Sequence, residues 1–168
     1  MKGFNDLADV VAPQVLLDAH RIGALLAALG VPHVLIGGLA GGLYGHPRAT
    51  KDVDYLVGAE AFERTSPVLV YREELKEAVT MGAIDLLAVP DHYPFLAEQL
   101  RVPAPGEVPV IAVEALVLMK LDANRPQDRS DVVGLLGAGA DLGSVRDYLK
   151  SRAPHLLHAF LELVDEAR

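Results

Sequence analysis

Two aspartates, Asp52 and Asp54, stand two positions apart at the start of the apolar word "VDYLV". Residues two apart on a β-strand point to the same face and lie about 7 Å apart along it. Carboxylates that close repel each other unless a cation lies between them or one is protonated. Their hard oxygen atoms suit Mg²⁺ or Mn²⁺. The pair therefore indicates either a metal site or a solvated turn, and its surroundings have to decide between the two.

Glycines upstream of this pair suggest a phosphate loop, because Gly37 and Gly38 directly follow the apolar word "VLI". A helix start preceded by glycines presents bare backbone N–H groups that can hold a phosphate. The segment "LIGGLAGGLYGHPRATKDVDYLV" nevertheless lacks the glycine spacing of a dinucleotide-binding fingerprint. It also lacks the Gly-Lys-Ser/Thr end of a P-loop. Both familiar glycine-loop interpretations therefore fail.

A third acid, Asp85, lies within the apolar run "AIDLLAV". Such a run predicts a strand buried on both faces. A lone carboxylate in a buried strand is energetically costly unless something pairs with it. A metal ion shared with Asp52 and Asp54 would supply that partner.

Taken together, these motifs resemble the signature of the nucleotidyltransferase superfamily related to DNA polymerase beta. That signature is an apolar residue and Gly-Gly, thirteen further residues, and then Asp-apolar-Asp-apolar. The word "GGLAGGLYGHPRATKDVD" is similar to small bacterial and archaeal members, some of which are abortive-infection toxins or their relatives. A later stretch, "VEALVLMKLDANRPQDRSDVVGLL", resembles their helical region, in which a Lys, an Arg and an Asp-Arg-x-x-Asp word recur. The resemblance spans residues 33 to about 150, most of the chain.

The resemblance implies a role for each motif residue. Gly37 and Gly38 would let the backbone approach the triphosphate of an incoming NTP, for example ATP. Asp52, Asp54 and Asp85 would hold Mg²⁺ or Mn²⁺, and Asp85 would help to deprotonate the attacking hydroxyl. An NMP would then move to a hydroxyl of RNA, protein or a small molecule, with release of pyrophosphate.

Three polar residues near the motifs each have two interpretations. Lys120, in the apolar word "LVLMKLDAN", is either a phosphate-binding cation or a lysine whose stem covers the core while its amine reaches water. Arg48 and Thr50 are close enough to Asp52 for phosphate or base contact, and a solvated loop is the alternative.

The following "RPQDRSD" word offers further candidates. Arg125 and Arg129 are weaker candidates for facing the site. Asp128 and Ser130 are expected to be helix N-caps, with Asp131 an acid in the first turn.

The hydrophobic pattern predicts the elements that position these residues. We expect helices over 12–30, from 39, over 91–100, 112–124, 128–137, 141–151 and 154–167, and strands over 34–36, 53–58 and 83–90. Residues 67–81 predict either two strands or one strand followed by a short helix, and 102–109 a Pro-rich loop. No internal repeat is present.

This order of elements predicts an α+β fold in one domain, residues 1–168. With the resemblance, residues 1–110 become a mixed-sheet nucleotidyltransferase core with flanking helices. Residues 111–168 become a C-terminal helical subregion packed on that core.

Composition limits the partners. The 168 residues carry a formal net charge of −8 and no cysteine, which excludes thiolate chemistry and favours a cytoplasmic location. No Lys/Arg cluster indicates a broad nucleic-acid-binding surface, and no apolar run is long enough for a membrane span. The expected binding partners are an NTP and an acceptor, and either a partner protein or a second copy of the chain is a further candidate.

Two alternative functions follow from the same sequence. The stretch "AEAFERTSPVLVYREELKEAVTM", interrupted by Pro67, is shorter than the helix and strands that relatives usually carry there. A catalytically inactive nucleotide- or partner-binding module, of the toxin–antitoxin type, is therefore the second hypothesis. A glycosyltransferase with an Asp-x-Asp metal site fits less well, because only about 50 residues precede the motif.

Overall fold

The structure is a computed structural model that describes residues 1–64, 68–81 and 83–167. Its three strands form one mixed sheet in the order β1-β2-β3, in which β2 is antiparallel to β1 and parallel to β3. The strands are β1 (His33–Leu35), β2 (Val53–Val57) and β3 (Ile84–Ala88). The α-helices are α1 (Pro13–Ala28), α2 (Gly37–Leu43), α3 (Glu73–Met81), α4 (Val113–Ala123), α5 (Pro126–Gly137), α6 (Leu142–Arg152) and α7 (Leu157–Glu166). The protein is therefore of the α+β class.

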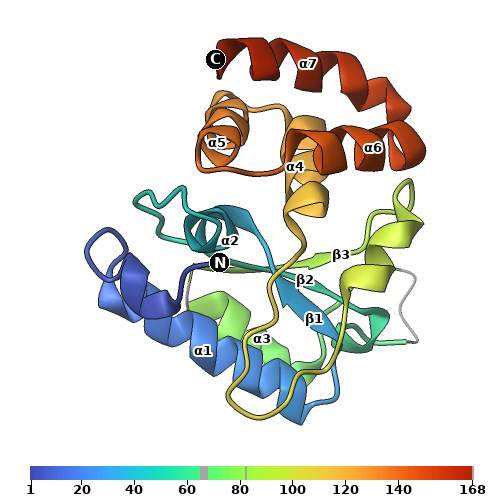
Figure 1. Ribbon diagram of the computed structural model, residues 1–168. Coiled ribbons are helices and arrows are strands. Elements are labelled where there is room, and N and C mark those ends of the chain that lie inside the picture. Colours follow the sequence, from blue (N-terminus) through green and yellow to red (C-terminus); the bar gives the residue numbers. More distant parts are fainter. Residues whose placement is uncertain (65–67, 82, 168) are drawn as a thin grey trace.

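The helices cover the two faces of the sheet unequally. Figure 1 shows α1 and α3 on one side and the four C-terminal helices, α4 to α7, on the other, with α2 beside β2. Val53, Tyr55 and Val57 of β2 pack into the core shared with α1 and α3. Leu56 packs into the second core, which the C-terminal helices build. Because side chains alternate along a strand, Asp54 faces the same side as Leu56, toward α4.

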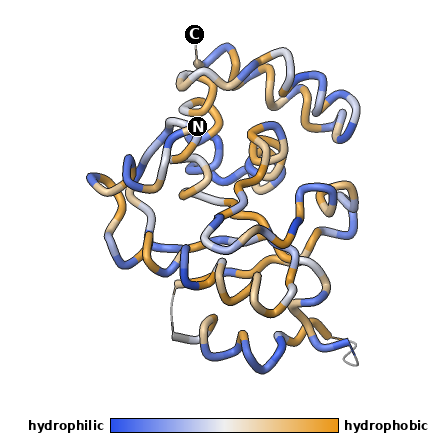
Figure 2. Tube along the Cα trace, turned by 60° about the horizontal axis from the view of Figure 1, so that its bottom comes forward, coloured by the Kyte–Doolittle hydropathy of each residue, from blue (hydrophilic) through white to orange (hydrophobic). Residues whose placement is uncertain are grey.

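The sequence explains the two helices that border the site. The first, α2, begins directly after β1 at Gly37, whose φ of +71° is readily adopted only by glycine. The second, α4, carries buried side chains around most of its circumference, as a helix between two layers must. It ends at Asn124, whose left-handed φ of 50° is a frequent helix terminator. Figure 2 shows hydrophobic and hydrophilic residues alternating along the more peripheral helices.

Most predicted elements are confirmed, with four corrections. The strand over 83–90 was expected to be buried on both faces. Only Ile84 and Leu86 are buried, whereas Asp85 and Leu87 are exposed, because β3 is an edge strand with one open face. The prediction over 91–100 is an α-helix, but the chain forms a 3-10 helix over Pro94–Gln99.

The third correction concerns the start of α5. This helix begins at Pro126 with Arg125 as its N-cap, so the assignment of Asp128 and Ser130 as N-caps is wrong. The acid of the first turn is Asp128, so the assignment of Asp131 to that turn is wrong as well. Proline is favoured at the first helical position because it has no N–H to leave unpaired.

Of the two alternatives for residues 67–81, the one with a short helix is confirmed over 73–81, where α3 forms. A fourth correction concerns the strand that both alternatives contained: it does not form over 68–72, where Tyr71 makes only an isolated bridge to Phe62. The predicted interruption at Pro67 lies outside the described residues. In the described part of the chain, no helix combines the length and hydropathy needed to cross a membrane.

Candidate functional site

A pocket lies between the sheet and the helices α4 and α5. Its cavity volume is about 350 Å³. The described residues that line it are Ile36, Gly37, Gly38, Arg48, Thr50, Asp52, Asp54, Asp85, Leu87, Leu116, Met119, Lys120, Ala123, Arg125, Gln127 and Asp128. All eight residues that the sequence assigned to metal, catalysis and nucleotide are among them, although they come from segments up to 83 positions apart. Of the two weaker candidates, Arg125 lines the pocket, whereas Arg129 pairs with Glu166 elsewhere.

The parallel pairing of β2 and β3 brings two carboxylates together. Asp54 and Asp85 are direct partners in this register, so both side chains leave the same face of the sheet. Asp52 precedes β2, which begins at Val53, and Asp52 is exposed. Asp54 is only partly exposed. The pocket floor therefore carries three acids with Asp54 as the most buried of them.

The environment of Asp54 disfavours its charged form. Burial, followed by the charges of Asp85 and Asp52, raises the pKa of Asp54 from 3.8 to about 6. Lys120 and Arg125 act in the opposite direction without cancelling this rise. The site thus has negative charge that its own cations leave uncompensated, and a bound cation would relieve it.

The donor atoms of the pocket show whether the site suits a divalent cation. Asp52, Asp54 and Asp85 supply only carboxylate oxygen, the donor that Mg²⁺ and Mn²⁺ prefer. Within the described ranges, no group of three or more His, Cys, Asp or Glu side chains is arranged so that it could hold a metal ion. The donor type and the excess negative charge fit such a cation, while the carboxylates do not converge in the arrangement described.

The two glycines make room for side chains of the pocket. A Cβ on Gly37 would overlap with the carboxylate of Asp54. A Cβ on Gly38 would lie 3.1 Å from the hydroxyl of Thr50 and 3.3 Å from Nη2 of Arg48. The Gly-Gly word therefore has a local structural purpose that sequence reasoning missed: it lets an acid and a cation approach the start of α2.

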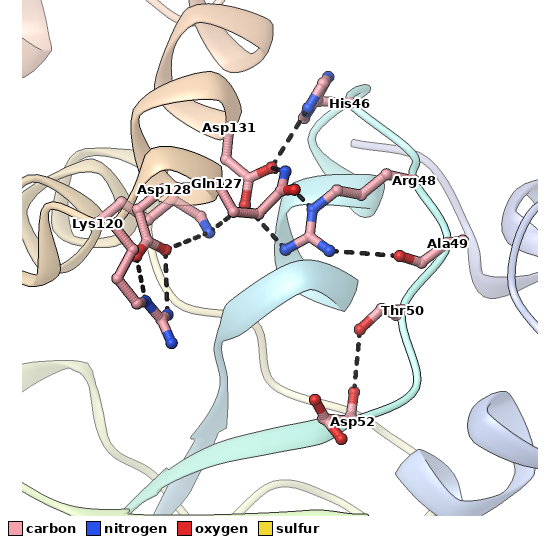
Figure 3. A network of polar contacts seen from close by, with 10 residues as sticks. His46, Arg48, Ala49, Thr50, Asp52, Lys120, Gln127, Asp128 and Asp131 are labelled. Carbon is pink, nitrogen blue, oxygen red and sulfur yellow. Dashed lines mark hydrogen bonds and ion pairs between the residues drawn. The ribbon is translucent and has the colours of Figure 1, made fainter.

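Above the carboxylates, a buried ion-pair network is centred on Asp131, whose side chain is 2% exposed. Arg48 donates from Nε to Oδ1 at 2.8 Å and from Nη2 to Oδ2 at 3.0 Å. Lys120 donates from Nζ to Oδ2 at 2.6 Å, and Gln127 donates from Nε2 to Oδ1 at 3.0 Å. His46 adds an ion-pair contact of 3.5 Å when it is protonated. Figure 3 shows these side chains converging on one carboxylate.

The network explains the state of Asp131. Burial by itself would raise the pKa of Asp131, but hydrogen bonds from Arg48 and Lys120 lower it to about 2. The Lys120 side chain is 5% exposed, so the interpretation of Lys120 as a lysine reaching water is wrong. Lys120 also lies 3.6 Å from Asp128, to which Arg125 donates from Nε at 2.6 Å.

The network ties the loop before β2 to the helical layer. Arg48 and His46 belong to the loop 44–52, Lys120 belongs to α4, and Asp131 to α5. His46 packs directly on Gly134 of α5, where any Cβ would overlap with the imidazole ring. Sequence reasoning missed the central position of Asp131. Its place in a predicted helix, one turn from apolar residues, was a usable sign that its side chain is buried.

Comparison with known proteins gives no assignment: no protein-family model matches the chain, and no curated protein matches it. What can be said of its function therefore rests on the fold and on this pocket.

Proposed function

We propose that the protein is a metal-dependent nucleotidyltransferase, which moves an NMP from an NTP to an acceptor hydroxyl and releases pyrophosphate. The observation that carries the proposal is the pairing of Asp54 with Asp85 inside a pocket that also holds Gly37, Gly38 and Lys120. Two acidic strand positions facing a cationic wall are the arrangement that phosphoryl transfer needs, since its catalysis is mainly positioning and charge stabilisation.

The divalent cation is assigned to the three carboxylates. Asp52, Asp54 and Asp85 would hold it, with rotation of the exposed side chains of Asp52 and Asp85. When bound, it would offset negative charge on the phosphates and on the carboxylates themselves. The raised pKa of Asp54 supports this assignment, because a cation is the group that makes the charged form of Asp54 favourable.

The chain's own residues supply binding and orientation. The phosphates are proposed to lie by Gly38, Thr50 and Arg48, where a bidentate contact to Asp131 already fixes the guanidinium in one orientation. Three of the five guanidinium N–H groups have partners within the chain, so the others are proposed to meet phosphate oxygen. Lys120 places a buried positive charge between the phosphates and α4.

The proposed transfer is one displacement at the α-phosphorus. The acceptor oxygen forms a bond to the α-phosphorus while the bond to the oxygen that bridges to the β-phosphorus breaks. Pyrophosphate leaves with that electron pair, and Asp85 receives the acceptor's proton. Asp85 is the candidate base because it is exposed within the pocket, on the open edge strand.

A second candidate function is nucleotide or partner binding without turnover. The specific observation behind it is that Arg48, Lys120 and Arg125, the cations that line the pocket, all pair with Asp131 or Asp128. Cations occupied in this way can stabilise a fold without contacting a substrate. The two candidates share the binding step and differ in transfer.

Calorimetry with each NTP, with and without Mg²⁺ or Mn²⁺, tests the binding step that both candidates share. We expect binding only with the metal, and at least tenfold weaker binding in Asp54→Asn. The matched control is Asp91→Asn, an exposed aspartate outside the pocket. Metal-dependent binding without transfer to any acceptor would favour the non-catalytic candidate. Absence of binding would eliminate the catalytic candidate and the nucleotide-binding form of the second candidate.

A further inference from the structure

One end of the pocket is apolar. Leu87 stands two residues after Asp85 on the same face of β3, and it is 40% exposed although it is a large hydrophobic residue. The helix α4 also lines the pocket, with Leu116, Met119 and Ala123, which share one helix face. An exposed leucine and an apolar helix face in a pocket that otherwise holds charged groups indicate a surface that contacts a ligand.

The polar and apolar walls lie at opposite edges of the sheet. The groups proposed for phosphate, Gly38 and Arg48, belong to α2 and the loop that follows it, beside β1 and β2. Leu87 belongs to β3, the other edge strand, as Figure 1 shows. Asp54 on the central strand lies between them. Leu87 therefore lies on the other side of Asp54 from Gly38, across the position where the displacement is proposed.

Charge around the apolar end disfavours an anionic ligand there. The cations among the described lining residues are all paired with Asp128 or Asp131. Asp85 precedes Leu87 by two residues on β3 and pairs with Asp54, and the whole protein has a formal net charge of −8. An acceptor with several phosphates would meet repulsion from these acids at β3, whose residues Ile84–Ala88 include no Lys or Arg.

We propose that this end is the acceptor subsite, and that the acceptor is an uncharged alcohol or phenol with an apolar framework beside its hydroxyl. The inference rests on the proposed function. A hydroxyl that gives its proton to Asp85 must lie at β3, so the carbon framework next to it meets Leu87 and the α4 stripe. The oxygen–phosphorus bond forms at that hydroxyl, and pyrophosphate leaves on the α2 side.

The test uses four acceptor probes with labelled ATP and Mg²⁺: para-cresol, an uncharged peptide with one tyrosine, glycerol, and a short single-stranded RNA. We expect transfer to para-cresol, to the peptide, or to both, which tells a free small molecule from a side chain as the source of the hydroxyl. Transfer to RNA or glycerol in preference to both aromatic probes would overturn the inference.

Leu87→Ser tests the subsite itself. We expect the KM for the preferred aromatic probe to rise about tenfold, as loss of one leucine's apolar contact predicts, while the KM for ATP stays within twofold. The matched control is Leu161→Ser, a similarly exposed leucine of α7 at 46% exposure, which should change neither KM. A rise in the KM for ATP alone would mean that the nucleobase occupies this end, and an unchanged acceptor KM would equally refute the subsite.

These outcomes are separable from failure of the proposed function. If ATP binds with Mg²⁺ and its α-phosphate is transferred to any acceptor, including water, the proposed function stands whatever Leu87→Ser does. If no nucleotide binds, the proposed function fails first and the acceptor inference fails with it.

Discussion

Asp54 and Asp85 stand opposite each other in the parallel register of β2 and β3, with their carboxylates on the face that α4 covers. The pairing joins positions 31 residues apart in the chain. Burial of Asp54 and, after it, the charge of Asp85 raise the pKa of Asp54 to about 6. The proposed chemistry begins from this relationship, since it marks where a cation is most strongly favoured.

Gly37→Ala should damage both the fold and the site. The Cβ would overlap with the Asp54 carboxylate, and the backbone φ of +71° would be strained. We expect the free energy of unfolding to fall by about 1–3 kcal/mol in urea denaturation. The control is Gly41→Ala in the same helix, because a Cβ added to Gly41 would have no neighbouring atom within 4 Å. That variant should gain about 0.5–1 kcal/mol, and equal losses in both variants would contradict the account.

Asp54→Asn should stabilise the metal-free protein near neutral pH. The folded-state pKa is raised from 3.8 to about 6, so the folded protein holds a proton that the unfolded chain releases between those pH values. The free energy of unfolding of the unsubstituted protein therefore falls as pH rises through this window. After a discount for partial exposure, we expect Asp54→Asn to gain about 1–2 kcal/mol at pH 7.5 and little at pH 4. Loss of stability at pH 7.5 would show that Asp54 is held by an attractive interaction.

Metal affinity should depend on pH through the same group. A proton on Asp54 competes with a cation, so binding of Mn²⁺ should be nearly constant above pH 6 and weaken as pH falls through about 6. Titration of Mn²⁺ followed by electron paramagnetic resonance measures this. Chelation should return the Asp54 pKa to its metal-free value, as carboxyl NMR can record. A pH-independent affinity between pH 5 and 7 would separate the metal from Asp54.

Asp131→Asn should destabilise the protein strongly. It leaves the charges of Arg48 and Lys120 without their shared partner in a buried position. We expect a loss of about 3–5 kcal/mol in urea denaturation at pH 7. The control, Asp147→Asn, removes an exposed pair with Arg146 and should change stability by less than about 0.5 kcal/mol.

Acid provides an independent check on the same residue. The pKa of Asp131 is lowered to about 2, so its contribution is complete above pH 4 and is lost as pH falls through 2. Asp131→Asn should therefore lose most of this acid-dependent change in unfolding free energy. A variant that unfolds in acid with the same steepness as the unsubstituted protein would contradict the assignment.

Much of the fold followed from local patterns. The spacing of apolar residues predicted α1, α4 and the three strands, because the burial of each is set by its own periodicity. The exposed face of β3 could not be predicted in this way. An edge strand and a central strand can share the same apolar composition, and only the tertiary arrangement decides which face stays open.

The site was predictable in its members but not in its contacts. Asp52, Asp54, Asp85 and the Gly-Gly word could be assigned to one pocket because their spacing resembles a known signature. The partners of Lys120 could not, since Asp131 reaches it through the packing of α5 on α4, which no local pattern encodes. For the same reason, the space that Gly38 leaves for Arg48 is visible only in three dimensions.

The most direct test of the central claim follows the fate of the nucleotide's phosphorus. The protein is incubated with Mg²⁺, an acceptor, and NTP labelled on either the α- or the γ-phosphate. The account predicts that the α-label becomes attached to the acceptor, that the γ-label leaves in pyrophosphate, and that Asp54→Asn does neither. Attachment of the γ-label instead, or α-label transfer that survives in Asp54→Asn, would contradict it.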